Sequence, residues 1–131
     1  MIDPVRPARR HSRIRPRRRA LRFGRIAEAC CAGLLRLKGF RIIARDFRVP
    51  VGEIDIIARK GAVLAFIEVK ARKNAAEEVL TTRQQRRIIR AAEAFMMTRP
   101  DLAGLDLRFD LMRFGGWRPP RHLCGAWRPE R

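Results

Sequence analysis

The sequence is poor in acidic residues, lysine and cysteine and has no long apolar segment. The last two of these shortages exclude classes of protein. No apolar run approaches the roughly 18 residues of a membrane-spanning helix, and no apolar segment follows the N-terminal charges as in a secretion signal. The three cysteines, Cys30, Cys31 and Cys124, form no CxxC pair and do not cluster with His11 or His122, so their spacing predicts neither a disulfide scaffold nor a zinc site. We expect a cytoplasmic protein with reduced, buried cysteines and no membrane partner.

Acidic residues number only 13 against 31 basic ones, which gives a net charge of +18 over 131 residues. Only four of the basic residues are lysine, and the other 27 are arginine. A domain this basic repels itself unless a polyanion or counterions balance its charge, which indicates a nucleic-acid partner. A compositional bias of the source genome is the alternative explanation for part of the arginine excess. The length suits a single domain with one modest core.

The first 21 residues read as a basic arm. Residues 1–20 hold eight arginines and a single acidic residue, too little apolar surface to order themselves. Such arms bind phosphate backbones without reading sequence. An organelle transit peptide would need an amphipathic helix, which Pro4, Pro7 and Pro16 interrupt. An inert extension is the other alternative.

Two helices are predicted from apolar residues at helical spacing. In residues 22–38 the stripe expected to be buried comprises Ile26, Ala29, Cys30, Gly33, Leu34 and Leu37. In residues 81–98 the buried stripe comprises Ile88, Ala91, Ala92, Phe95 and Met96, while the arginines at 83, 86, 87 and 90 stay in water.

Four strands are predicted, at residues 40–49, 53–59, 62–71 and 105–114. Gly61 supplies the permissive backbone of a hairpin between the second and third. The order α-β-β-β-α-β predicts an α/β domain over residues 22–114, with a mixed central sheet flanked by helices. The Pro- and Arg-rich tail, residues 115–131, is expected to pack back onto it.

Four charged groups on the predicted hairpin carry the chemistry. Because side chains alternate along a strand, Glu53 and Asp55 share one face, as do Glu68 and Lys70. A two-residue loop at 60–61 would put Glu53 opposite Glu68. Any register in which paired residue numbers add to an odd value keeps all four groups together, and a slip by one residue separates them.

Carboxylates crowded on an apolar sheet are costly unless a cation or hydrogen-bond donors compensate them. Mg²⁺, a hard cation, suits two or three such oxygens with water. Lys70 beside them could orient a metal-bound water and offset phosphate charge, an arrangement that fits phosphodiester hydrolysis. The alternative is a surface Glu/Lys ladder of cross-strand ion pairs.

Several motifs resemble, in order and spacing, the YraN family of small bacterial proteins, over about residues 22–127. They are residues 52–58 (GEIDIIA), residues 66–72 (FIEVKAR), Arg108-Phe109-Asp110, Glu28 with Ala29, residues 39–42 (GFRI), His122-Leu123 and Ala126-Trp127. That family is similar to the PD-(D/E)xK nuclease superfamily and to archaeal-type Holliday-junction resolvases. The resemblance therefore implies a restriction-endonuclease-like fold.

The resemblance also implies roles for individual residues. Asp55 and Glu68 would be ligands of Mg²⁺ or Mn²⁺, Lys70 the catalytic lysine, and Glu28 an auxiliary acid from the first helix. Glu28 lies nearly opposite the main stripe of its helix, on a side that is also apolar, so its place in the site stays open. Where the family often has lysine at the start of the second helix, this sequence has Gln84, which brings no charge.

These patterns favour an endonuclease-like protein that hydrolyses DNA with a metal ion, with branched or damaged DNA among the implied substrates. The expected nucleic-acid contacts are Arg72, Lys73, Arg83, Gln84, Arg86, Arg87 and Arg90. No helix-turn-helix or zinc finger is present to read bases, so we expect structure-selective or nonspecific binding. A non-catalytic nucleic-acid-binding or assembly factor with the same fold is the alternative. The oligomeric state stays open, although a homodimer would suit cutting of both strands.

Three polar residues outside the hairpin have structural interpretations. Arg108 and Asp110 are expected to form an ion pair, and His122 a hydrogen bond that docks the tail.

Overall fold

The protein is described here from a computed structural model covering residues 24–71, 80–115 and 118–129. The first helix occupies residues 24–37. It is followed by β1 (Arg41–Val49), β2 (Gly52–Lys60), β3 (Val63–Ala71), α2 (Thr82–Thr98), the short 3-10 helix η2 (Pro100–Leu102), β4 (Asp106–Phe114) and β5 (Arg121–Trp127). None of the helices in these ranges is long and apolar enough to cross a bilayer. The predicted basic arm lies outside the described residues.

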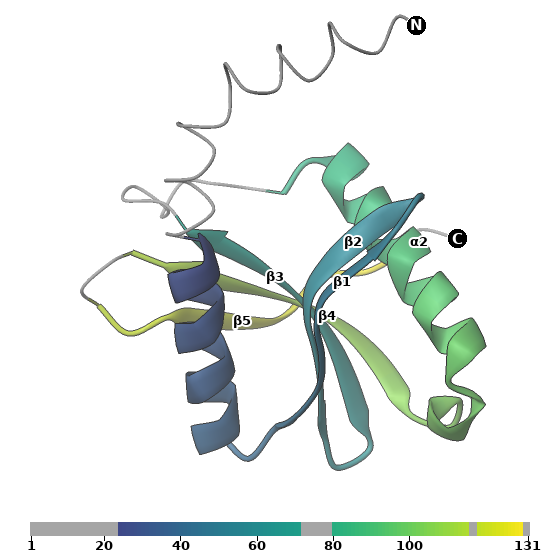
Figure 1. The fold of residues 1–131 in the computed structure, drawn as a ribbon, viewed down its shortest axis with the longest axis horizontal. Helices are drawn as coiled ribbons and strands as arrows, with labels where there is room; N and C mark the ends of the chain where they lie inside the picture. Colours follow the sequence, from purple (N-terminus) through teal and green to yellow (C-terminus); the bar gives the residue numbers. More distant parts are fainter. Residues whose placement is uncertain (1–23, 72–79, 116–117, 130–131) are drawn as a thin grey trace, which may run out of the picture.

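The five strands form one mixed sheet in the order β1-β2-β3-β4-β5, in which only β3 and β4 run parallel. The first helix covers one face and α2 covers the other (Figure 1). This architecture confirms the predicted α/β, restriction-endonuclease-like fold. Within the segment predicted as a tail, residues 121–127 form a fifth strand, β5, along β4, and no strand was predicted there.

The core under α2 matches the sequence pattern. Ile88, Ala91, Ala92 and Phe95 are buried, and Met96, also predicted to be buried, is half-buried against the same core. Phe66 of β3 packs edge-on against Phe95 at a centroid distance of 6.2 Å. The arginines of α2 lie outside this stripe, as predicted.

The predicted buried stripe of the first helix is wrong. Ala27, Cys31, Ala32 and Leu35 are buried. Of the predicted stripe, Leu34 is half-buried against the same core, and four members are exposed: Ile26, Ala29, Cys30 and Leu37, the last by 87 %. This helix carries two apolar stripes, and periodicity does not choose between them. The sheet covers the stripe whose one charged residue, Glu28, finds an ion-pair partner there.

The predicted burial of all three cysteines is also wrong: Cys30 and Cys124 are exposed, and only Cys31 is buried. All three are free thiols, as expected.

The register of β2 and β3 differs from the predicted one by one pair. Lys60 pairs with Val63 and Ile56 with Ile67, so paired numbers add to 123, and Glu53 does not lie opposite Glu68. Gly61 has a φ of 60°, and this left-handed residue takes the first loop position rather than the last. The paired numbers nevertheless add to an odd value, which is the condition stated above for the four charged groups to share a face in a regular ladder.

Candidate active site

The alternation of side chains between the two faces of the sheet is interrupted in β2 at Asp55. Ile54 belongs to the core under α2, and Ile56 to the core under the first helix. Residues two apart on a regular strand share a face, so the strand must twist between them. Asp46, the β1 residue across from Asp55, has a φ of 53°, which marks the same break on the neighbouring strand. The regular β2–β3 ladder ends at Ile56, and Asp55 is the first residue beyond it.

The break lets the Asp55 side chain reach β3. Its Oδ2 accepts a hydrogen bond from the Val69 backbone N–H at 2.7 Å, and its carboxyl group shares a hydrogen bond with that of Glu68. The Nζ of Lys70 lies 3.7 Å from Glu68 Oε2, with both side chains mostly buried. The structure thus brings together Asp55, Glu68 and Lys70.

Burial dominates the electrostatics of the two carboxyl groups. It raises the pKa of Glu68 to about 9, and the charge of Asp55 contributes in the same direction. Burial also raises the pKa of Asp55, although the hydrogen bond from Val69 opposes this. At neutral pH the pair therefore retains a proton unless another cation replaces it. A hard divalent cation with oxygen ligands fits this pair of carboxylates.

Glu28 lies at the edge of the same site. A hollow of about 170 Å³ between the first helix and the strands is lined by Gly24, Arg25, Glu28, Asp46, Arg48, Asp55 and Val69. Arg45 Nε donates to Glu28 Oε1 at 3.0 Å. Burial raises the pKa of Glu28, and the bond from Arg45 opposes the rise. Glu28 thus shares a hollow with Asp55 but has an arginine partner.

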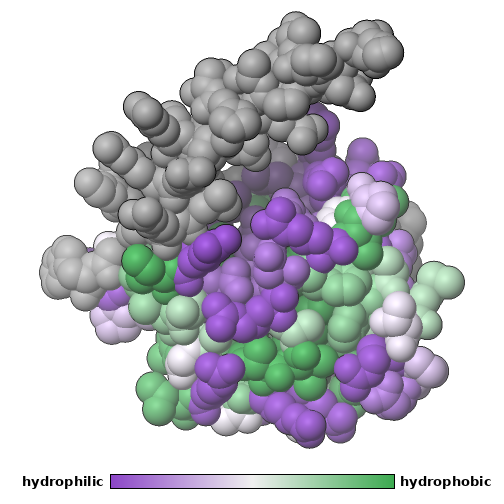
Figure 2. Space-filling view, viewed as in Figure 1, coloured by the Kyte–Doolittle hydropathy of each residue, from purple (hydrophilic) through white to green (hydrophobic). Residues whose placement is uncertain are grey.

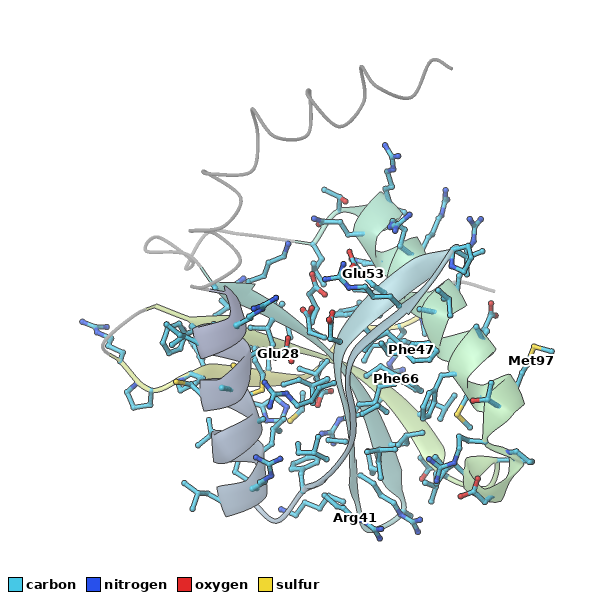
Figure 3. All side chains as sticks on the ribbon, viewed as in Figure 1. Glu28, Arg41, Phe47, Glu53, Phe66 and Met97 are labelled. Carbon is cyan, nitrogen blue, oxygen red and sulfur yellow. The ribbon has the colours of Figure 1, made fainter. Side chains whose placement is uncertain are left out.

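Glu53 has a different environment from the other acidic residues of the hairpin. It is exposed, and Arg48 Nε lies 3.7 Å from its Oε2. Figure 3 shows Glu28 and Glu53 directed toward the space between the first helix and the β1–β2 hairpin. Glu53 adds negative potential near Asp55 without joining the buried pair.

An arginine ridge on α2 adjoins this end of the sheet. We use that name for Arg83, Arg86, Arg87 and Arg90, all exposed. Helix and strand approach closely because Gly52 has no side chain: a Cβ there would lie 1.9 Å from the Arg87 carbonyl oxygen. Hydrophilic side chains gather from the first helix across the hairpin toward α2 (Figure 2).

Gln84 has a structural role that the sequence analysis missed. Its Oε1 accepts from the Thr81 backbone N–H at 2.9 Å, and its own backbone N–H donates to Thr81 Oγ1 at 3.1 Å. This capping box, whose signature was present as Thr81 followed three residues later by glutamine, fixes the start of α2. The predicted contacts Arg72 and Lys73 lie outside the described residues.

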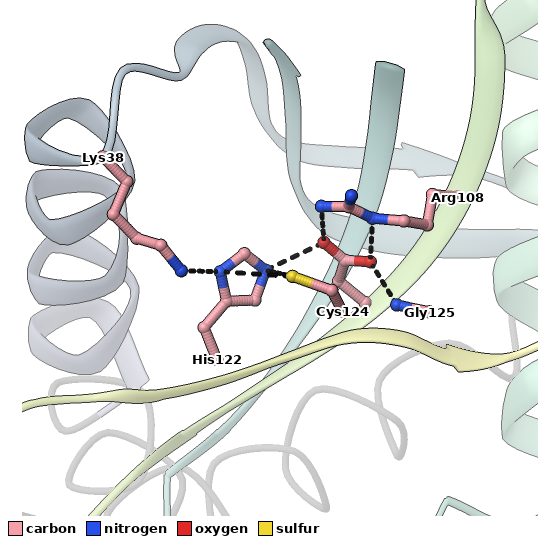
Figure 4. Close-up of polar contacts among 6 residues, drawn as sticks. Lys38, Arg108, His122, Cys124 and Gly125 are labelled. Carbon is pink, nitrogen blue, oxygen red and sulfur yellow. Dashed lines mark hydrogen bonds and ion pairs between the residues drawn. The ribbon is translucent and has the colours of Figure 1, made fainter.

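A second polar cluster surrounds the buried Asp110 (Figure 4). Arg108 donates two hydrogen bonds to its carboxylate, each 2.9 Å long, and the Gly125 N–H donates a third at 2.9 Å. His122 Nε2 lies 2.8 Å from Asp110 Oδ2, and His122 Nδ1 lies 2.6 Å from Lys38 Nζ. The predicted ion pair and docking bond are confirmed. Lys38, which links the first helix to β5, was missed.

Asp110, His122 and the nearby Cys124 could in principle ligate a metal, since their donor atoms lie within 4.8 Å of one another. The Arg108 guanidinium already occupies the Asp110 carboxylate, however, and Lys38 lies on the far nitrogen of His122. Two cationic groups in contact with these ligands disfavour a further cation. We assign the cluster a structural role.

Residues 27–114 match the model of the uncharacterised protein family UPF0102. The chain belongs to this family. UPF0102 is the YraN family that the motifs indicated.

Named relatives in this family are similar over most of their length. A UPF0102 protein of Parvibaculum lavamentivorans is 51% identical over 112 residues, covering 84% of each chain. One of Bradyrhizobium sp. strain ORS 278 is 52% identical over 110 residues, covering 82% of this chain and 78% of its own. One of Paramagnetospirillum magneticum is 45% identical over 115 residues, covering 83% and 89%.

Proposed function

We propose that this UPF0102 protein is a metal-dependent nuclease that hydrolyses phosphodiester bonds, with DNA as the favoured substrate. The observation that carries the proposal is the mostly buried Asp55–Glu68 pair with Lys70 beside it. A buried pair of carboxyl groups that must keep a proton is costly for stability alone. Such a pair is typical of a site that exchanges the proton for a metal ion.

Each residue of the site has a distinct role in this proposal. Asp55 and Glu68 would hold Mg²⁺ or Mn²⁺, which supplies a more acidic water and neutralises phosphate charge when bound. Val69 fixes the Asp55 carboxylate through its backbone N–H. Lys70 places a positive charge beside the reacting phosphate. Glu28 would assist from the first helix after leaving Arg45.

Substrate binding would be mainly electrostatic. The arginine ridge adjoins the site through the contact of Gly52 with α2, so a bound strand can reach both. No described element presents side chains in the manner of a base-reading helix, which favours binding by backbone and shape. The affinity should therefore fall steeply with salt.

The test is cleavage of linear, flapped and four-way DNA in Mg²⁺ or Mn²⁺. Asp55→Asn, Glu68→Gln and Lys70→Met should abolish cleavage but retain salt-dependent binding. Glu53→Gln is the matched control, because Glu53 is an exposed carboxylate of the same strand outside the buried pair. Cleavage that survives in the first three variants would show that the assigned site is wrong.

A non-catalytic nucleic-acid-binding or assembly factor is the second candidate. The observation in its favour is that Glu28 and Glu68 already have ion-pair partners, Arg45 and Lys70. This candidate predicts salt-dependent binding without cleavage. It also predicts that Mn²⁺ titrated against the protein gives no binding that Glu68→Gln removes.

A further inference from the structure

The sheet register places an apolar pocket beside the candidate active site. Glu68 on β3 pairs with Leu111 on β4, and Leu111 pairs with Leu123 on β5. Leu111 and Leu123 pack in the core under α2, and alternation along β3 puts Glu68 on that same face. One row of neighbouring residues therefore leads from Glu68 to Leu123.

Leu111 and Leu123 line a pocket of about 340 Å³, whose other apolar walls are Leu80, Ala126 and Trp127. This volume lies within the range of small-molecule sites, about 300–1,000 Å³. Trp127 is buried, with 8 % of the residue exposed, and its Nε1 has no hydrogen-bond partner among the described residues. An unmet buried donor is unfavourable in a rigid core. The walls thus suit a flat heterocycle with polar edges.

Positive charge continues from the pocket to the arginine ridge. Gln85 lines both this pocket and a neighbouring hollow whose basic residues are Arg86, Arg90 and Arg128. Arg128 directly follows Trp127 in the chain. The pocket therefore opens beside groups that bind phosphate, and an apolar hollow within a basic surface complements a base attached to its phosphates.

We propose that this pocket receives one unpaired base of a nucleic-acid strand whose neighbouring phosphates lie on Arg86, Arg90 and Arg128. The proposal rests on the proposed function, because the same strand would reach Glu68. A base inside a duplex is paired and stacked and must be extracted before it can enter such a pocket. The site thus selects single-stranded or locally unpaired substrate over a continuous duplex.

The chain contains its own reporter and control for this test. Cys124 is an exposed residue at the rim of the pocket whose Sγ lies 3.6 Å from His122 Nε2, and Cys30 is an exposed thiol on the outer side of the first helix. We would measure alkylation of both in Asp55→Asn, which prevents cleavage, at one fixed salt concentration. A saturating single-stranded oligonucleotide should slow Cys124 alkylation by about ten-fold, given typical base stacking, and leave Cys30 unchanged. A matched duplex and an abasic oligonucleotide, with the same phosphates, should protect Cys124 little.

Filling the pocket provides the second measurement. Ala126→Phe adds a ring at its exposed edge, and Ala29→Phe makes the same change on the outer side of the first helix. Ala126→Phe should weaken single-strand binding by about ten-fold and leave abasic binding intact, whereas Ala29→Phe should change neither.

The outcomes separate this inference from the proposed function. If single strands bind but leave Cys124 equally reactive, the pocket assignment is overturned while Asp55-dependent cleavage can still stand. If none of the three oligonucleotides binds, both the assignment and the proposed function fail.

Discussion

The carboxyl groups of Asp55 and Glu68 share a hydrogen bond across the point where the β2–β3 ladder ends. Both groups are mostly shielded from water and the pKa of Glu68 is raised to about 9, so the pair keeps a proton at neutral pH in the absence of a metal ion. The same break in the strand gives Asp55 its bond from the Val69 N–H. One local irregularity thus positions the pair and sets its protonation.

The pH dependence of stability should follow from this pair. Because the pKa of Glu68 rises from 4.5 to about 9 on folding, its protonated form favours the folded state. That contribution is complete below pH 4.5 and is lost as the pH rises toward 9. Thermal melts in EDTA should therefore show a melting temperature that falls across this range. Glu68→Gln should flatten the fall, and an unchanged slope would contradict the assignment.

Divalent metal should act most strongly at the alkaline end of that range. If Asp55 and Glu68 hold Mg²⁺ or Mn²⁺ as proposed, the metal would replace the shared proton, so binding should release a proton and tighten with pH. The rise in melting temperature on adding Mn²⁺ should be larger at pH 8.5 than at pH 6. Calorimetry in two buffers of different ionisation enthalpy measures the proton directly. Metal binding without proton release would place the metal elsewhere.

Gly52 should tolerate no side chain. Its Cβ would lie 1.9 Å from the backbone oxygen of Arg87, and backbone cannot move aside as a flexible side chain does. Gly52→Ala should lower the free energy of unfolding by about 1–3 kcal/mol or more and weaken nucleic-acid binding, because α2 must shift. Gly33→Ala is the control: it has open space within its helix and should be neutral or stabilising. Equal denaturation midpoints for the two variants would argue against the close approach.

The sequence predicted that Asp55, Glu68 and Lys70 would lie together, but not how they come together. Alternation along β3 put Glu68 and Lys70 on one face, whereas the family motifs singled out Asp55, which lies just beyond the regular ladder that ends at Ile56. The predicted pairing of β2 with β3 was wrong because Gly61, with its positive φ, is the first residue of the two-residue loop and not the last. Strand β5 escaped prediction because it lies in a segment rich in proline and arginine, and its contacts come from β4. Lys38 and His122 are 84 residues apart, so no local pattern links them.

Two leucines of the first helix test which of its sides is buried. Leu35 is fully buried and Leu37 is 87 % exposed, although apolar spacing favoured burial of Leu37. Leu35→Ala should therefore cost about 2–5 kcal/mol of unfolding free energy, whereas Leu37→Ala should have little effect. Chemical denaturation of the two variants provides the comparison. The reverse order of stabilities would restore the stripe that was predicted to be buried.

Two arginine–aspartate pairs of the same spacing and geometry isolate the effect of burial on the Asp110 cluster. Arg99 donates two hydrogen bonds to Asp101, of 2.9 and 2.8 Å, much as Arg108 does to Asp110. Asp101 is exposed, however, whereas Asp110 is buried. Asp110→Asn should cost about 3 kcal/mol, because it leaves the partners of a buried charge uncompensated. Asp101→Asn should cause no measurable change, because water replaces the partner.

The Asp110 cluster should stabilise the folded protein at neutral and alkaline pH and lose this contribution in acid. Burial tends to raise the pKa of Asp110, but hydrogen bonds from His122, Arg108 and Gly125 outweigh it and hold the pKa below 3.8. A lowered pKa stabilises the fold above the unfolded value, and the contribution is lost as the pH falls through the folded value. The difference in stability between the native protein and Asp110→Asn should therefore be constant above about pH 5 and shrink in stronger acid. A difference that grew on acidification would mean that the carboxyl group is protonated in the folded protein, and that the bonds from Arg108 and His122 do not act on a charged group.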